Sequence, residues 1–121
     1  MSILECTSSN QSKTPDISIL LPFKNEEKFI LEAIDSILRQ SERSFEVIAI
    51  DDNSTDSSFS LLEEKSLEDK RIKLFKNKSK GVISALKMAL DKSEGKFITR
   101  QDADDIMPEH KLKLLKKLLL E

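Results

Sequence analysis

Two short stretches of the chain are almost entirely apolar: DISILLPF at 16–23 and FEVIAI at 45–50. A strand that is apolar at successive positions, rather than at alternate ones, must be covered on both faces of its sheet. Two weaker strand patterns follow, RIKLF at 71–75 and KFITR at 96–100. Cover on both faces requires helices between the strands, and this requirement limits the fold more than any other feature of the sequence.

The segments between these strands carry apolar residues at helical spacing. The segment 25–40 predicts a helix with Asn25 as its N-cap. A second helix, capped by Ser54 or Thr55, is expected to fade near Asp69. The inward positions predicted for the first helix are Phe29, Ala33, Ile34, Ile37 and Leu38.

Two further helices are expected in the second half of the chain. The segment 81–95 predicts a helix with Gly95 as its stop signal. Pro108 suits the first turn of a closing helix, PEHKLKLLKKLLLE. The positions expected to face inward are Val82, Ala85, Leu86, Ala89 and Leu90 in the first of these helices, and Leu112, Leu115, Leu118 and Leu119 in the second.

The resulting order, β-α-β-α-β-α-β-α with short connections, predicts an α/β fold. We expect a Rossmann-like three-layer α/β/α arrangement with a mostly parallel sheet and right-handed crossovers. Pro22 is expected to end the pairing of the first strand. With strand order 3-2-1-4, the order reverses between the first and fourth strands, where such sheets bind ligands. PFKNEE, DDNSTD and DADD would then face one crevice.

Composition narrows the class of protein. The 121 residues, 38% hydrophobic and 35% charged with a net charge of −2, indicate one globular domain without bulk affinity for nucleic acid. We expect a loose polar arm at 1–15 and the domain at 16–121. The single cysteine, Cys6, makes a reducing cytoplasm the default location. The absence of a Cys/His cluster and the presence of only two glycines exclude structural zinc and glycine-rich phosphate loops.

Two aspartates in DADD, Asp102 and Asp104, stand two positions apart after the fourth expected strand. In extended backbone such side chains point the same way, so their carboxylates repel one another unless a cation compensates them. Mg²⁺ or Mn²⁺ with oxygen ligands is the natural partner, and it commonly joins carboxylates to substrate phosphates. The alternative is that these residues and Asp105 are solvated loop residues ahead of a helix at Pro108.

Polar residues also follow the first two strands. Asp52 could accept hydrogen bonds from a nucleobase or ribose, or it could be solvated in a turn together with Asp51. Lys24 could meet a phosphate or an acid, whereas Asn25 and the glutamates behind it could simply start the helix. The lone histidine, His110, is interpreted as a surface residue.

Three segments together resemble the N-terminal, nucleotide-sugar-binding half of family 2 glycosyltransferases, which have the GT-A fold. The match covers about residues 16–112 in both order and spacing, so we expect a truncated GT-A fold. The matching segments are ISILLPFKNEEKFILEAIDSILRQSERSFEVIAIDDNSTDSS, NKSKGVISALKMALDKSEGKFI and TRQDADDIMPEHKL.

The resemblance implies a role for each motif. The segment 22–26 would line the nucleoside pocket, Asp52 would hydrogen-bond the base, usually uracil, and Asp102 would face the ribose or diphosphate. Asp104, which closes the family's Asp-x-Asp motif, would bind Mn²⁺ or Mg²⁺ with the diphosphate, and Asp102 is a second candidate ligand. The donor-binding residues so implied are Pro22, Phe23, Lys24, Asn25, Glu26, Asp52, Asp102 and Ala103.

The resemblance further implies an inverting, hexosyltransferase-type enzyme that moves a sugar from a UDP-sugar to the hydroxyl of a saccharide or lipid-linked acceptor. Its setting would be cell-surface polysaccharide or glycolipid synthesis, in the cytoplasm or at the inner face of the membrane. The family's general base would lie beyond Glu121, so no catalytic residue is named and the chain alone is expected to be inactive. Two departures from the family are Lys24, in place of a stacking aromatic residue, and Ala85-Leu86-Lys87, in place of Ala-Arg-Asn.

Two alternatives and one further contact stay open. The chain could be a nucleotide-binding fragment without turnover. It could also be a phosphorelay receiver domain, because IAIDDN resembles the receiver's acidic pair, although here a full β-α unit precedes it. The closing helix, with leucines opposite lysines, is expected to pack on the sheet or on the missing half. It could instead rest on a membrane surface.

Overall fold

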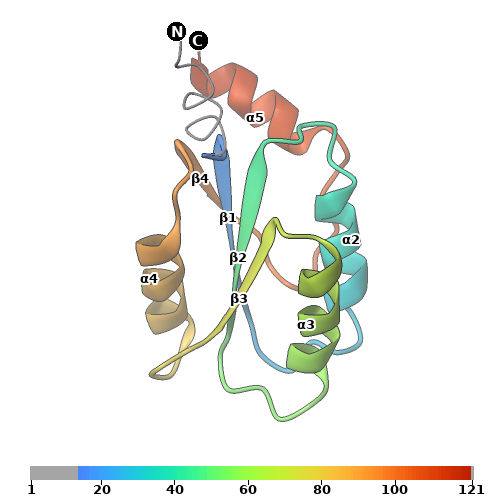
Figure 1. The fold of residues 1–121 in the computed structure, drawn as a ribbon, viewed down its shortest axis with the longest axis vertical. Helices are drawn as coiled ribbons and strands as arrows, with labels where there is room; N and C mark the ends of the chain where they lie inside the picture. The colour runs from blue at the N-terminus through green and yellow to red at the C-terminus, as the bar shows by residue number, and fades with distance from the viewer. Residues whose placement is uncertain (1–13, 121) are drawn as a thin grey trace, which may run out of the picture.

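The computed structural model describes residues 14–120, which form a four-stranded parallel sheet between helices (Figure 1). The sheet has the order β3-β2-β1-β4, and every neighbouring pair is parallel. The predicted fold class and strand order are therefore confirmed. The arm expected at 1–15 lies outside the described residues except for its last two positions. The strands are β1 (Ile17–Phe23), β2 (Phe45–Asp51), β3 (Ile72–Lys76) and β4 (Phe97–Arg100).

Helices cover both faces of the sheet, with α2 and α3 on one side and α4 on the other (Figure 1). Alternate strand residues point to opposite faces, so the core divides into two clusters. The larger cluster joins β1 and β2 to α2 and α3, and the smaller one joins them to α4. No helix among residues 14–120 is long and apolar enough to span a bilayer. The helices are α2 (Ile30–Leu38), α3 (Ser58–Glu68), α4 (Val82–Lys92) and α5 (Lys111–Leu120).

The first two helices begin later than predicted. Phe29, not Asn25, is the N-cap of α2, because the Asn25 side chain accepts from the N–H groups of Thr55 and Asp56 rather than from those of α2. Asn25 itself is left-handed, with φ 54°. The N-cap of α3 is Ser57 rather than Ser54 or Thr55. The predicted end of α3 is confirmed, since Asp69 is its C-cap.

The inward faces of the later helices are narrower than predicted. In α4 only Ala85 and Ala89 are buried, whereas Val82 and Leu90 are 42% and 50% exposed. The two small alanines let the helix lie close to β1 and β2, which turns the flanking positions outward. α4 ends at Lys92, before Gly95.

α5 begins at Lys111, so Pro108 precedes the helix instead of standing in its first turn. Leu112 is fully buried in the larger core cluster and Leu115 is half-buried, which confirms packing on the described domain for this end of the helix. Leu118 and Leu119, which were also expected inward, are more than half exposed.

Pro22 does not end the pairing of β1 with β2, which continues through Pro22 to Phe23. Successive residues of a parallel strand bond to opposite neighbours, and the Leu20 carbonyl accepts from Gln101 on the β4 side. Pro22 therefore directs its missing N–H towards β4, whose pairing has already ended at Leu20. The proline costs the sheet no hydrogen bond.

A buried polar cluster lies at the opposite end of the sheet. The Glu46 carboxylate, 2% exposed, accepts from the Ser18 hydroxyl (2.6 Å), the Lys73 ammonium (2.8 Å) and the Glu94 N–H (2.7 Å). Burial alone would raise the pKa of Glu46, but these hydrogen bonds outweigh it and hold the pKa below its ordinary value. Gly95 also donates its N–H to the Ser18 hydroxyl at 2.7 Å.

We expect Gly95→Ala to destabilise the protein. A Cβ there would lie 2.6 Å from both the N and the Oγ of Ser18, which are fixed in β1 and its polar cluster. Overpacking of this kind costs about 1–3 kcal/mol. The free energy of unfolding from urea denaturation checks this value. Exposed Lys96→Ala is the control, and equal stability of the two variants would contradict the close contact.

Candidate functional site

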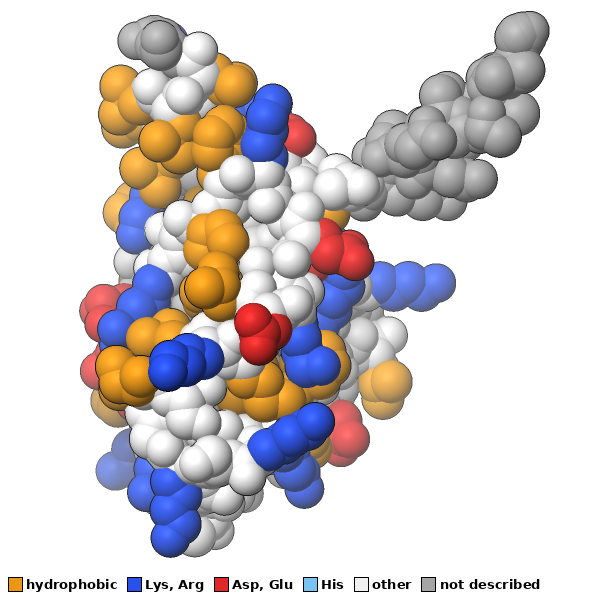
Figure 2. Space-filling model, turned by 90° about the vertical axis from the view of Figure 1, so that its left-hand side faces the viewer, with side chains coloured by type: hydrophobic (Ala, Val, Ile, Leu, Met, Phe, Trp, Pro, Cys, Tyr) orange, Lys and Arg blue, Asp and Glu red, His pale blue; other side chains and the backbone are white. Residues whose placement is uncertain are grey.

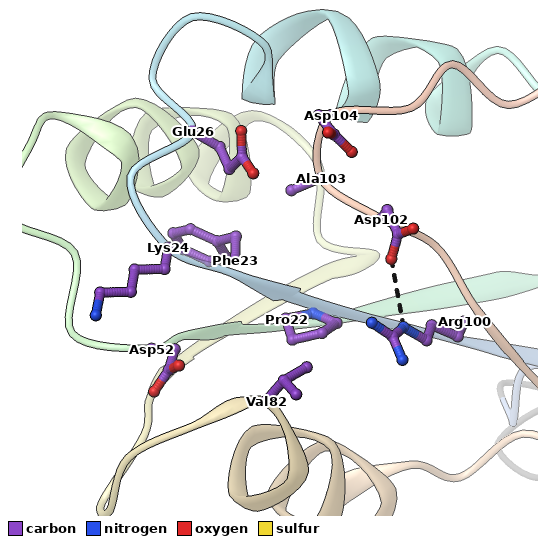
Figure 3. Close-up of a pocket in the computed structure, with 10 residues that line it drawn as sticks. All are labelled: Pro22, Phe23, Lys24, Glu26, Asp52, Val82, Arg100, Asp102, Ala103 and Asp104. Carbon is purple, nitrogen blue, oxygen red and sulfur yellow. Dashed lines mark ion pairs between the residues drawn. The ribbon is translucent and has the colours of Figure 1, made fainter.

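The carboxyl ends of β1, β2 and β4 surround an open pocket of about 320 Å³, and Val82 at the start of α4 lines one side of it (Figure 3). Three loops that are distant in the sequence thus meet at one edge, as the strand order predicts. Figure 3 shows Glu26 and Asp104 at one end of the pocket and Asp52 at the other. The lining residues are Pro22, Phe23, Lys24, Glu26, Asp52, Val82, Arg100, Asp102, Ala103 and Asp104.

The structure brings together all the predicted site residues except Asn25. Two lining residues, Val82 and Arg100, were not predicted. Arg100 could have been predicted from the sequence. It stands two positions before Asp102 in extended backbone, so the two side chains point to the same side. Val82 was assigned to the helix core instead. His110, predicted to be a surface residue, is exposed and lies outside this pocket.

Asn25 ties the loop after β1 to the loop after β2. Its Oδ1 accepts from the N–H groups of Thr55 (2.7 Å) and Asp56 (3.2 Å), and its own N–H donates to the Ser54 hydroxyl (2.9 Å). The Glu26 N–H donates to the Ser58 hydroxyl at 2.7 Å. These reciprocal bonds fix the position of Glu26 in the pocket wall without help from a ligand.

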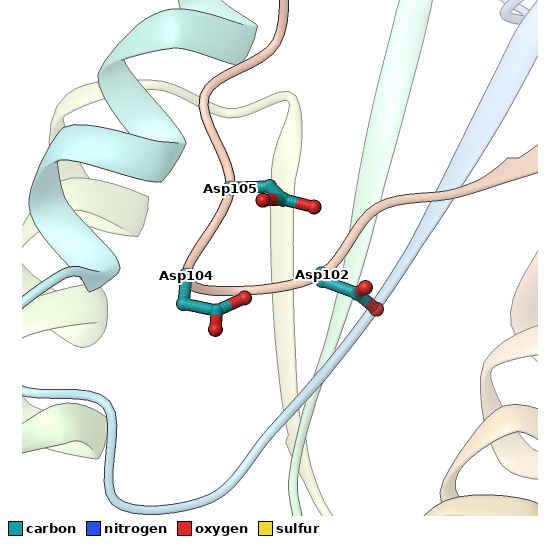
Figure 4. Close-up of side chains that lie close together, drawn as sticks. All are labelled: Asp102, Asp104 and Asp105. Atoms are coloured by element: carbon teal, nitrogen blue, oxygen red, sulfur yellow. The ribbon is translucent and has the colours of Figure 1, made fainter.

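The side chains of the three aspartates of DADD lie close together (Figure 4). Asp102, Asp104 and Asp105 each offer one oxygen, and these oxygens lie within 4.8 Å of one another. A turn brings them together, since the Asp105 N–H donates to the Asp102 carbonyl (3.1 Å) and buried Gln101 donates to the Asp105 carbonyl (3.2 Å). An all-carboxylate oxygen set suits a hard divalent cation.

Negative charge predominates in the pocket. Four carboxylates, those of Glu26, Asp52, Asp102 and Asp104, line it together with only two cationic side chains. One of these, Arg100, forms an ion pair with Asp102 at 3.3 Å. Burial first, and then the charges of Asp104, Asp56 and Asp102, raise the pKa of Glu26 above its ordinary value. The geometry can thus accommodate a cation, or a ligand that arrives with one.

The chain matches the family described as Glycosyl transferase family 2 over residues 18–121, and it therefore belongs to that family. It is 44% identical over 93 residues to an uncharacterised glycosyltransferase of Haemophilus influenzae, covering 76% of this chain and 29% of that protein. It is 36% identical over 107 residues to the UDP-Glc:α-D-GlcNAc-diphosphoundecaprenol β-1,3-glucosyltransferase WfgD of Escherichia coli, covering 87% of this chain and 41% of WfgD. The chain spans less than half the length of either relative.

Solved structures support the same assignment. TarS 1-349 of S. aureus in complex with UDP superposes with a TM-score of 0.78 and 29% identity, over 86% of this chain and 32% of that one. The mannosyltransferase PcManGT of Pyrobaculum calidifontis, in complex with GDP-Man and Mn²⁺, gives a TM-score of 0.70 and 27% identity over 78% and 29% of the two chains. The resemblance to glycosyltransferases is confirmed, and the receiver-domain alternative is excluded.

We expect Glu26→Gln to increase stability at neutral pH. A carboxyl whose pKa is raised on folding binds its proton more tightly in the folded state, so its ionisation destabilises the fold as pH rises above the unfolded value of 4.5. The advantage of Gln over Glu should therefore be present at pH 7 and vanish below pH 4.5. Urea denaturation of both proteins across this range measures it. The control is Glu63→Gln on the exposed side of α3; a constant difference at all pH values would contradict the electrostatic cause.

Proposed function

We propose that this chain forms the donor-binding part of a glycosyltransferase that uses a UDP-sugar. One observation carries the proposal: Asp52 lines the same pocket as Asp102 and Asp104, which lie fifty residues further along the sequence. TarS, which is similar to this chain, has been solved with UDP, and the name of WfgD specifies a UDP-Glc donor. We further propose a saccharide or lipid-linked acceptor hydroxyl, and synthesis of a cell-surface polysaccharide or glycolipid in the cytoplasm.

The positions of the pocket residues suggest which part of the donor each of them contacts. Asp52 accepts a hydrogen bond from the base, while the wall from Pro22 to Glu26 encloses the nucleoside. Asp102 faces the ribose or diphosphate, and Arg100 offers the diphosphate a positive charge. Asp104 holds Mn²⁺ or Mg²⁺, with Asp102 and Asp105 in reach as further ligands. When bound, that ion would stabilise the charge that develops on the departing nucleoside diphosphate.

The transfer step needs one more group. A general base must lie within hydrogen-bond reach of the attacking acceptor hydroxyl. Within residues 14–120, each carboxylate of this pocket already has a proposed role: it contacts the nucleobase, faces the diphosphate, binds the cation or forms the wall. We therefore assign donor binding to this chain, whereas sugar transfer is proposed for the protein together with whatever supplies the general base.

Binding of UDP to the 121-residue chain should depend on metal. Without a divalent ion, the acidic pocket repels the diphosphate, and Mn²⁺ should tighten binding by about tenfold or more, or about 1.4 kcal/mol. Asp104→Ala should lose this gain, yet bind UDP slightly better than the parent in EDTA, because one negative charge is gone. Isothermal titration calorimetry with Mn²⁺ or EDTA distinguishes these effects.

The matched control for that titration is Asp91→Ala, which removes an exposed carboxylate of α4 outside this pocket. It should behave like the parent in both conditions. Equal affinity of the parent with Mn²⁺ and with EDTA would exclude the metal role of Asp104. Absence of UDP binding in every condition would exclude the proposed function itself.

We also propose that α5 contacts an anionic membrane surface, as suits an enzyme with a lipid-linked acceptor. Figure 2 shows hydrophobic side chains gathered over α5 at the top of the molecule. Leu114, Leu118, Leu119 and Leu120 are each 56–58% exposed. Lys113 and Lys117 lie exposed on the same helix, and their charge complements acidic headgroups.

Replacing Leu118 and Leu119 together by Glu should weaken this contact. Burial of a leucine is worth about 1.5–3 kcal/mol, so binding to vesicles that contain phosphatidylglycerol should weaken by about tenfold or more. Cosedimentation measures the loss, and Leu67→Glu, at a position 83% exposed on α3, is the control. If the parent does not bind these vesicles, the membrane proposal is overturned.

A further inference from the structure

Asp52 presents its two carboxylate oxygens to different surroundings. Oδ1 accepts from the Gly81 N–H at 2.9 Å, from Asn77 Nδ2 at 3.0 Å and from Asn53 Nδ2 at 3.3 Å. Within residues 14–120, no hydrogen-bond donor engages Oδ2. Since Asp52 lines the pocket, the carboxylate offers its ligand one unengaged acceptor.

Asn77 is the side chain that sets this arrangement. It directly follows β3, is 9% exposed, and donates its own N–H to the Asp51 carbonyl at 2.9 Å. Its Oδ1 accepts from the Ser79 N–H (3.1 Å) and the Ser84 hydroxyl (3.0 Å). Two donors at Oδ1 determine which way the amide faces, so Nδ2 must point towards Asp52.

Two neighbouring residues with unusual backbone conformations also donate to Asp52 Oδ1. Asn53 and Gly81 both have positive φ, 64° and 97°, and both donate to Asp52 Oδ1. The Asn53 amide also donates to the Ser79 carbonyl at 3.0 Å, which links the loop after β2 to the loop before α4. β3 contributes no lining residue to the pocket. The end of β3 influences the pocket through Asn77, which donates to Asp52.

We propose that Asn77 is a positioning residue that gives the donor site its preference for a base with a ring N–H. This inference rests on the proposed function. With Oδ1 held by three donors, Oδ2 is the carboxylate oxygen left to accept a hydrogen bond from the base. Uracil presents N3–H to such an oxygen, whereas cytosine presents a bare N3 whose lone pair the carboxylate repels. The two bases have nearly the same size and differ in the hydrogen bonding of N3 and of the group on C4, so a contact with N3 distinguishes them.

The test compares UDP with CDP in the presence of Mn²⁺. We expect the parent 121-residue chain to prefer UDP and Asn77→Ala to reduce the ratio of the two affinities by about tenfold, the usual effect of one hydrogen bond to a charged group. Asn77→Asp keeps the size and both serine contacts, yet cannot donate to Asp52 and adds a like charge. It should reduce the ratio at least as much, and it serves if the alanine variant does not fold.

A stability control separates positioning from general damage. Ser18→Ala removes a hydrogen bond to Glu46 at the opposite end of the sheet, so it should lower stability and leave the UDP to CDP ratio unchanged. If both Asn77 variants weaken UDP and CDP equally, Asn77 is only structural and the inference is overturned while the proposed function stands. If the parent itself binds neither nucleotide, the proposed function fails and the inference fails with it.

Discussion

β1 is hydrogen-bonded to β2 along its whole length but to β4 only as far as Leu20, and the pocket depends on this stagger. The Phe23 carbonyl accepts from the N–H of Asp52, whereas the Leu20 carbonyl accepts from that of Gln101. The two acidic loops therefore leave the sheet three residues apart, or about 10 Å along the strand. The DADD loop crosses the space that β4 would otherwise fill. Pro22 lies just beyond the point where the pairing of β1 with β4 ends, and it has no N–H that could bond to a longer β4.

At each of the three strand ends, a residue that supports the loop precedes one that lines the pocket. Asp51 is buried and accepts from the Ser54 N–H, while Asp52 faces the ligand side. Gln101 is buried against the DADD turn, while Asp102 is exposed. Asn25 holds the neighbouring loop, while Glu26 lines the wall. After β2 and β4, extended backbone turns successive side chains to opposite sides, so the supporting residue comes directly before the residue that it helps to place. Asn25 is left-handed instead, and its hydrogen bonds to the loop after β2 place Glu26.

The strands, their order and most of the pocket could be predicted because they follow from local pattern and from the geometry of parallel sheets. The start of α2 could not be predicted, since Asn25 bonds to residues about thirty positions away and local capping rules do not include such partners. Asn77 was missed for a related reason. An asparagine after a short amphipathic strand reads as an ordinary turn residue, and its partner Asp52 becomes adjacent only when β3 pairs with β2. Arg100 was within reach of the same alternation argument that selected Asp102 and Asp104.

The charge of the pocket has a consequence for the order in which ligands assemble there. Four carboxylates against two cations leave an excess of two negative charges before any ligand binds. Burial and its acidic neighbours already raise the pKa of Glu26, which shows that negative charge is disfavoured at this edge of the sheet. A nucleoside diphosphate alone would add to the repulsion among these negative charges, whereas a divalent cation alone would reduce it. Under the proposed function, entry of the cation before the nucleotide or together with it is therefore the favoured order. A cation beside Asp102 would also take over the charge that Arg100 now balances, which would free Arg100 for the diphosphate.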